Sequence, residues 1–117
     1  MKVKFDVMFL EDAAGFLELL DQKPRDKIIY NINKARISND KNLFKKLKGE
    51  IWEFRTVYNK MYYRLFAFWD KTDSTETLVI STHGIIKKSK KVPMSEIEKA
   101  EHIRRLYFNQ KNTGHEK

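Results

Sequence analysis

The chain of 117 residues has no cysteine, only four glycines and two prolines, and no long apolar run. The absence of cysteine excludes disulfides, thiolate metal ligands and a cysteine nucleophile, and it fits a reducing compartment such as the cytosol. The few dispersed glycines form neither a phosphate-binding loop nor a dinucleotide fingerprint. No apolar stretch approaches the ~18–20 residues of a membrane span. We therefore expect a cytoplasmic protein that neither enters a membrane nor uses a small-molecule cofactor.

Histidine is also scarce, and its placement argues against a metal site. The three histidines, His83, His102 and His115, do not have the spacing of metal ligands. The apolar run near the N-terminus is short and interrupted by Asp6, unlike a signal peptide. A hydrophobic content of 41% can fill the core of one domain, which we expect to span residues 1–117.

Positive charge is abundant but concentrated in the middle of the chain. The net charge is +8. Residues 1–40 hold seven basic and seven acidic side chains, and residues 92–117 hold five and four. Residues 41–91 hold twelve basic and five acidic side chains, a net +7. Such asymmetry indicates a surface that meets a polyanion, most simply nucleic acid, although a charge that serves only solubility is the alternative.

Hydrophobic spacing predicts an α+β domain with the element order β-α-α-β-β-β-α. Strands are expected at 2–9, 50–57, 61–70 and 76–85, and helices at 11–22, 24–38 and 95–108. A short helical turn is expected at 41–48, a tight turn at Asn59-Lys60, a polar connection at 71–75 and a flexible tail at 109–117. The last helix is expected to open with a capping box at Ser95 to Glu98. The hairpin-like spacing predicts a small, twisted antiparallel sheet with a mixed edge, with the helices on one face.

The alternation of side chains along each strand predicts two different faces. The face expected to meet the helices contains Trp52, Phe54, Leu65, Trp69, Leu78 and Ile80. The face expected to stay open contains Glu53, Arg55, Arg64, His83, Tyr62, Phe66 and Phe68. Cations beside aromatic rings can hold phosphates and stack bases, so this face predicts an RNA surface. The lysine-rich segment after His83 is expected to border it.

Cleavage of RNA by its own 2′-oxygen needs a proton acceptor, cations near the phosphoryl oxygens and a proton donor for the leaving oxygen. It needs no metal. Arginine can bind phosphate with two parallel hydrogen bonds, and clustered lysines can lower one another's pKa. The candidate catalytic residues are therefore Arg64, Arg55, Lys87 and His83. The candidate RNA-binding residues are Lys45, Lys46, Lys48, Lys88, Lys90, Lys91, Tyr62 and Phe66.

Several of these candidates have a plain structural alternative. Arg55 and Arg64 could each be an exposed strand cation paired with Glu53, and Glu53 could instead be a general base. His83 could be a core or edge histidine whose hydrogen bonds are satisfied. The lysines between 45 and 48 could form the solvated face of a helix.

Four stretches together resemble the RelE/ParE toxin superfamily, most closely its phage-derived, HigB-like branch. They are LKGEIWEFR (47–55), MYYRLFAFW (61–69), THGIIKKSKKVP (82–93) and SEIEKAEHIRR (95–105). The resemblance spans about residues 43–105 and implies a RelE-like fold. Arg64 matches the phosphate-binding arginine of the tyrosine-arginine strand, Arg55 matches a basic strand position, and Lys87 and Lys88 match a basic pair. Some relatives use a C-terminal tyrosine or histidine in catalysis, but we do not assign that role to Tyr107 or His115.

What the resemblance implies is the toxin of a toxin–antitoxin pair. Such toxins enter the ribosome and cut mRNA there, so ribosomal RNA and mRNA are expected partners, together with a cognate helix-turn-helix antitoxin. Two other functions remain open: a ParE-like toxin that inhibits gyrase, and a non-catalytic RNA-binding regulatory module. The codon preference, the general acid and base and the oligomeric state do not follow from the sequence.

Overall fold

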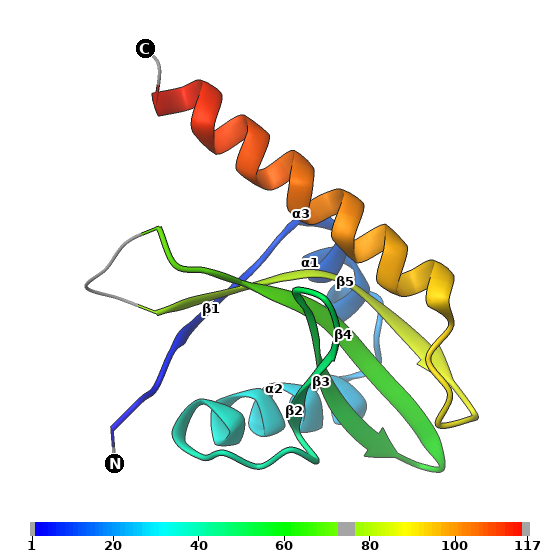
Figure 1. The fold of residues 1–117 in the computed structure, drawn as a ribbon. Helices are drawn as coiled ribbons and strands as arrows, with labels where there is room; N and C mark the ends of the chain where they lie inside the picture. The colour runs from blue at the N-terminus through cyan, green and yellow to red at the C-terminus, as the bar shows by residue number, and fades with distance from the viewer. Residues whose placement is uncertain (1, 73–76, 116–117) are drawn as a thin grey trace.

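A five-stranded mixed sheet forms the centre of the computed structural model, which describes residues 2–72 and 77–115. The elements run in the order β1 (Asp6–Phe9), α1 (Glu11–Glu18), α2 (Gln22–Ile37), β2 (Phe44–Lys48), β3 (Ile51–Tyr58), β4 (Met61–Asp70), β5 (Leu78–Lys87) and α3 (Met94–His115) (Figure 1). The strand order is β1-β5-β4-β3-β2. Strand β1 is parallel to β5 and every other pair is antiparallel, which confirms the predicted α+β class and the mixed edge.

The hairpin of β3 and β4 forms as the sequence predicts. Asn59 and Lys60 both have positive φ, 51° and 66°. Two consecutive residues with positive φ make the turn whose twist matches that of antiparallel strands. The pairing that follows sets Arg55 opposite Arg64 and Val57 opposite Tyr62. The hairpin therefore brings the central cations of the sequence together.

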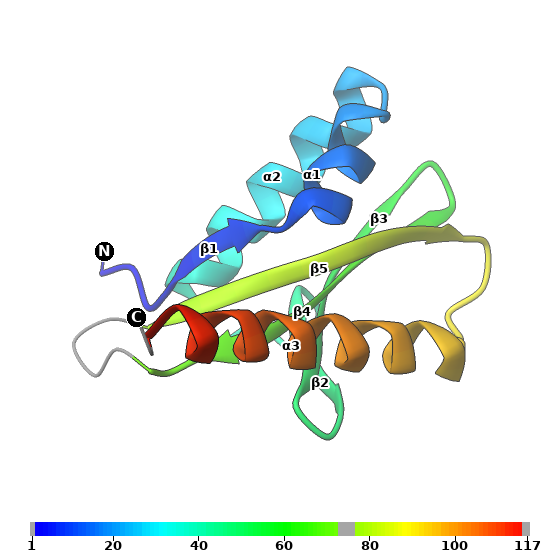
Figure 2. The ribbon, with the colours of Figure 1, turned by 90° about the horizontal axis from the view of Figure 1, so that it is seen from above.

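The helices cover both faces of the sheet rather than one. Figure 2 shows α1 and α2 on one side of β5 and α3 on the other. The core under α1 and α2 includes Phe54, Leu65, Ala67 and Val79, with further apolar side chains from both helices. The core under α3 contains Ile51, Phe66, Phe68, Ile80 and Ala100. The predicted open face is therefore wrong for the part of the sheet that α3 covers.

Residues 44–48 form an edge strand and not the expected turn of helix. Phe44 pairs with Phe54, and their rings stack with centroids 4.3 Å apart. Lys45 then faces the α3 side of the sheet with Leu47, whose side chain packs on the α3 core. The helical pattern was wrong here because packing against β3 overrides a weak local preference.

A β-bulge in β5 changes the face on which its side chains lie. Leu65 pairs with Gly84 and Ala67 with Ser81, so β5 has one more residue than β4 over this interval. An extra residue breaks the period of two. As a result His83 and Ile80 both lie on the α3 face, whereas unbroken alternation had assigned Ile80 to the opposite face. Leu78, which packs on the same core, was also misassigned.

Helix α3 starts earlier and extends further than its sequence pattern predicts. It begins at Met94, so Ser95 lies inside the first turn and is not the residue before the helix that a capping box needs. It continues past Phe108 to His115. Residues 73–75 of the expected polar connection, and Glu76 at the start of the strand predicted to follow it, lie outside the described residues.

Candidate nucleic-acid interface

On the α3 face of the sheet, cross-strand partners form three rows, each running across neighbouring strands and each closer than the last to the β3–β4 turn. The first contains Lys45, Glu53 and Phe66, the second Arg55, Arg64 and Ile85, and the third Val57, Tyr62 and Lys87. The residues after β5, 88–93, lead to α3 and lie at the same end of the molecule as the β3–β4 turn in Figures 1 and 2. This end is where most of the predicted site residues meet.

The guanidinium of Arg64 is buried and does not reach the solvent-exposed side of these rows. Its side chain is only 1% exposed. Nη1 donates a hydrogen bond to the carbonyl of Ser89 at 3.3 Å, and Nη2 donates one to the carbonyl of Lys90. The ring of Tyr62 lies 5.0 Å from the guanidinium carbon. The structure thus contradicts the expectation that Arg64 is an open cation ready to bind phosphate.

Glu53 is the ionic partner of Arg64. Its Oε1 lies 2.9 Å from Nε of Arg64, and both side chains are 1% exposed. The two atoms are not aligned as a hydrogen bond, so the contact is an ion pair. Burial raises the pKa of Glu53, although the charges of Arg64, Lys45 and Arg55 oppose the shift. Of the two ion pairs that the sequence left open for Glu53, the one with Arg64 is present, though buried rather than exposed, and the one with Arg55 is not.

His83 is a core histidine whose ring nitrogens both have partners. It is 2% exposed and its ring stacks on Phe66 at 4.8 Å. Nδ1 lies 3.0 Å from the hydroxyl of Thr82, and Nε2 lies 2.9 Å from Oε1 of Glu96. Burial lowers the pKa of His83 and Lys99 lowers it further, against the opposing effect of Glu96. The structure favours the core-histidine alternative over a role at an open site.

Phe66 and Lys46 do not join the other predicted residues on the accessible part of the α3 face, for different reasons: Phe66 is buried, and Lys46 is exposed on the opposite face of the sheet. Phe66 is fully buried under α3, so the prediction that it stacks RNA bases is wrong for this arrangement. Lys46 pairs with Trp52, whose ring stacks with Phe44 on the opposite face of the sheet. Lys46 therefore points away from Lys45.

The remaining predicted residues form what we call the basic surface: Lys45, Lys48, Arg55, Tyr62, Lys87, Lys88, Lys90 and Lys91. The last four lysines are exposed, as is Lys48, while Lys45, Arg55 and Tyr62 are half-buried. Clustered cations beside one accessible aromatic ring can bind the phosphates and a base of single-stranded RNA. The lysine segment, residues 87–91, thus borders the sheet face as the sequence predicted. Arg64 lies buried beneath this segment and contacts its backbone.

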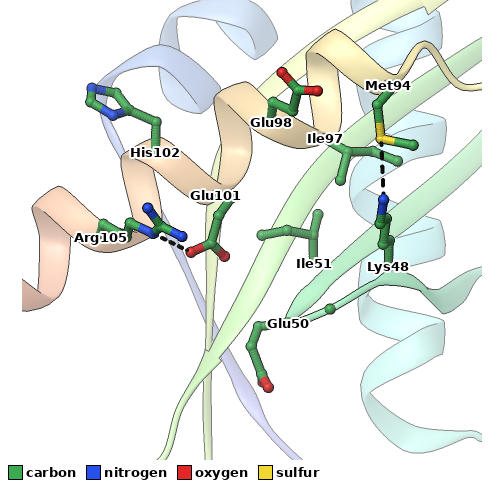
Figure 3. Close-up of a pocket in the computed structure, with 10 residues that line it drawn as sticks. Lys48, Glu50, Ile51, Met94, Ile97, Glu98, Glu101, His102 and Arg105 are labelled. Carbon is green, nitrogen blue, oxygen red and sulfur yellow. Dashed lines mark hydrogen bonds and ion pairs between the residues drawn. The ribbon is translucent and has the colours of Figure 1, made fainter.

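A groove of about 440 Å³ lies beside this surface, between the β2–β3 turn and the first half of α3 (Figure 3). Its apolar side chains are Ile51, Met94 and Ile97. Lys48 lies at one end, with its Nζ 4.0 Å from the sulfur of Met94. Glu101 and Arg105 form an ion pair at the other end, at 2.8 Å. The sequence pattern did not predict this groove, because it depends on where α3 packs.

A second polar cluster, which the sequence analysis missed, joins α3 to the end of β4. The buried carboxylate of Asp70 accepts hydrogen bonds from Tyr107 at 2.5 Å and from Lys111 and Thr72, both at 2.7 Å. Burial alone would raise the pKa of Asp70, but these hydrogen-bond donors hold it well below its usual range. Burial and the neighbouring Asp70 raise the pKa of Tyr107. The cluster fixes the second half of α3 on the sheet. Its members are far apart in sequence, so no local motif indicates it.

Over residues 2–72 and 77–115, no three acidic or histidine side chains gather in a way that could hold a metal ion. In the same part of the chain, no helix combines the length and the apolar character needed to cross a bilayer.

The fold and surface define a small α+β domain with a basic, partly aromatic patch at one end of its sheet. The chain matches the family described as Phage derived protein Gp49-like (DUF891) over residues 15–105. The match covers most of the chain, so the protein belongs to this family of phage-derived, toxin-like proteins. No curated protein matches the chain significantly.

Proposed function

We propose that this protein is the toxin of a type II toxin–antitoxin pair, and that it inhibits translation by cutting mRNA on the ribosome. In this proposal the fold is that of RelE toxins, within the HigB-like branch. The partners are ribosomal RNA, mRNA and a cognate helix-turn-helix antitoxin that neutralises the toxin. Because both RNA partners are cytoplasmic, the protein is expected to act in the cytoplasm.

One observation supports the proposal above the others: the family match and the basic surface coincide. Every residue of the basic surface, from Lys45 to Lys91, lies inside the matched range 15–105. The surface combines the cations that phosphates need with the half-buried ring of Tyr62. A toxin-like family and an RNA-type surface together favour an RNA target.

The proposed reaction starts with the 2′-oxygen of one nucleotide attacking the neighbouring phosphorus. The 2′-hydroxyl loses its proton to a base, the bond from phosphorus to the 5′-oxygen breaks, and the 5′-oxygen takes up a proton. The products are a 2′,3′-cyclic phosphate and a 5′-hydroxyl end. Arg55 and Lys87 are the cations we assign to the phosphoryl oxygens, because both are accessible and lie in adjacent rows.

The test is expression of the protein in bacterial cells, followed by mapping of mRNA ends by primer extension. We expect growth arrest and cuts in phase with codons, both lost in Arg55→Ala. A matched control is Lys34→Ala, which removes one exposed cation from α2, on the other face of the sheet. Intact mRNA together with DNA breaks would replace the proposal with gyrase inhibition.

The burial of Arg64 and His83 favours a second candidate, a non-catalytic RNA-binding module. Both residues were expected to act on RNA, yet each is at most 2% exposed. If the cells contain neither cut mRNA nor broken DNA while the purified protein binds RNA, this second function is the correct one.

A further inference from the structure

The contacts of Arg64 are directed at the backbone of the lysine segment. Its two terminal nitrogens donate to consecutive carbonyls, those of Ser89 and Lys90. The side chains on either side of these carbonyls, including Lys88 and Lys91, are exposed. A phosphate cannot reach a guanidinium that is 1% exposed unless the segment first moves. Arg64 therefore contacts the backbone of the segment, whereas the lysines of the segment face solvent.

The segment needs such an anchor, because its own sequence opposes a fixed conformation. Lys87, Lys88, Lys90 and Lys91 carry like charges within five residues, and like charges repel at this spacing. The described residues 88–93 belong to no helix or strand. Hydrogen bonds from a charged donor are among the stronger ones in proteins, and Glu53 and Tyr62 hold that donor in place.

We propose that Arg64 is a positioning residue: it anchors residues 88–91 through the carbonyls of Ser89 and Lys90 and thereby presents the surrounding lysines to RNA phosphates, without itself binding phosphate. The inference concerns the same surface as the proposed function and rests on it for the identity of the ligand. It assigns phosphate contact to the exposed lysines and to Arg55, and support of the segment to Arg64.

The test uses three variants of the full chain. The double variant Glu53→Leu/Arg64→Met replaces the buried ion pair with apolar side chains of similar size and leaves the net charge unchanged. Glu53→Gln keeps the guanidinium and its two carbonyl contacts. Arg55→Gln removes an accessible cation from the same row of the sheet. All three are compared with the unaltered protein.

The first measurement is the ¹⁵N heteronuclear NOE of residues 88–91, which reports fast backbone motion without any ligand. We expect lowered values there in the double variant and values as in the unaltered protein in Glu53→Gln, with β3 and β4 unchanged in both. An ordered 88–91 segment in the double variant would overturn the anchoring role, whether or not the protein binds RNA.

The second measurement is the affinity for a labelled single-stranded RNA of twenty nucleotides at several salt concentrations. The double variant should bind about tenfold more weakly, because the mobile lysines must be ordered on binding, yet keep the salt slope of the unaltered protein. Arg55→Gln should lower the slope by about 0.7, the value of one phosphate contact on a single strand.

A slope lowered by the same amount in the double variant would mean that Arg64 binds phosphate and would overturn the proposal. If the unaltered protein binds no RNA, the proposed function fails, and with it the presentation of lysines to RNA. The NOE measurement then still decides whether Arg64 anchors the segment.

Discussion

Two arginines face each other across β3 and β4, and their surroundings give them different roles. Arg55 is half-buried and forms no ion pair with any residue in the ranges 2–72 and 77–115, whereas Arg64 is buried against Glu53. We expect Arg55→Ala to change the free energy of unfolding by less than about 0.5 kcal/mol. Arg64→Ala should cost about 3–5 kcal/mol, since it leaves the Glu53 charge buried without a partner. Urea denaturation of the two variants measures both values.

The comparison with the double variant Glu53→Leu/Arg64→Met shows whether the pair itself is the cause. Apolar replacements of a buried ion pair are often neutral, so the double variant should recover most of the stability that Arg64→Ala loses. A double variant as unstable as Arg64→Ala would show that contacts of Arg64 other than the ion pair dominate its effect on stability.

His83 should make the stability of the protein depend on pH between about 7 and 5. Burial lowers its pKa in the folded state, so the unfolded chain binds more protons once the pH falls through the ordinary value of about 6.5. Folding stability is therefore lost as the pH falls through this range. The free energy of unfolding measured at pH 7 and pH 5 should decrease in the unaltered protein by more than in His83→Gln.

The difference between the two proteins isolates His83 from other titrating groups. Glu53, whose raised pKa acts with the opposite sign, is present in both proteins. Asp70, whose pKa is lowered, stays ionised at pH 5 and above. If the free energy of unfolding fell equally in both proteins between pH 7 and pH 5, His83 would not be the cause of the pH dependence.

Among the elements, β5 meets α1 at a point where only glycine fits. A Cβ on Gly84 would overlap the ring of Phe16. Gly84→Ala should therefore cost about 1–3 kcal/mol of stability, the usual range for overpacking in a core. Thermal unfolding measures the loss. Adding Phe16→Leu should restore part of it, and a purely additive loss would show that the clash with Phe16 is not the cause.

How far the sequence predicts these elements depends on how strongly each pattern is determined locally. The β3–β4 hairpin was predictable because its alternation is unbroken and its first turn residue, Asn59, is a type that adopts positive φ readily. The segment 44–48 was not, because its strand forms only by pairing with β3. The bulge in β5 leaves no clear signal, and it moved Ile80 to the face of His83.

The largest error of the sequence analysis was to place α3 on the same face of the sheet as α1 and α2. The sequence of β4 contains a signal that the sheet is covered on both faces. Residues 64–68 of β4 are all buried, and four of the five are apolar, on both faces of the strand. A continuous apolar run is typical of a strand covered on both sides. Pattern alone could not show that Arg64 turns its donors toward two backbone carbonyls, because a carbonyl has no sequence signature.

At the scale of the whole molecule, the net charge of +8 can serve the proposed RNA binding only through cations that lie beside the bound strand. Of the twelve basic residues between 41 and 91, seven lie in the two rows nearest the β3–β4 turn, in that turn or in the segment after β5, while residues 1–40 are neutral overall. Phosphate contact depends on the cations that lie close to the strand, and distant charges are screened within about 8 Å at physiological salt. The position of a lysine should therefore matter more than the total charge.

Two quadruple variants with the same net charge test whether the position of the lysines or the total charge determines RNA binding. One changes Lys87, Lys88, Lys90 and Lys91 to Gln, and the other changes Lys2, Lys4, Lys23 and Lys34, which are exposed on the N-terminal half. Each lowers the net charge from +8 to +4, since four positive charges are removed. The first should lower the salt slope for single-stranded RNA by about 2–3, at about 0.7 for each phosphate contact, and the second should leave it nearly unchanged. Equal losses in both would mean that the protein attracts RNA through its overall charge, and that the basic surface is not a defined site.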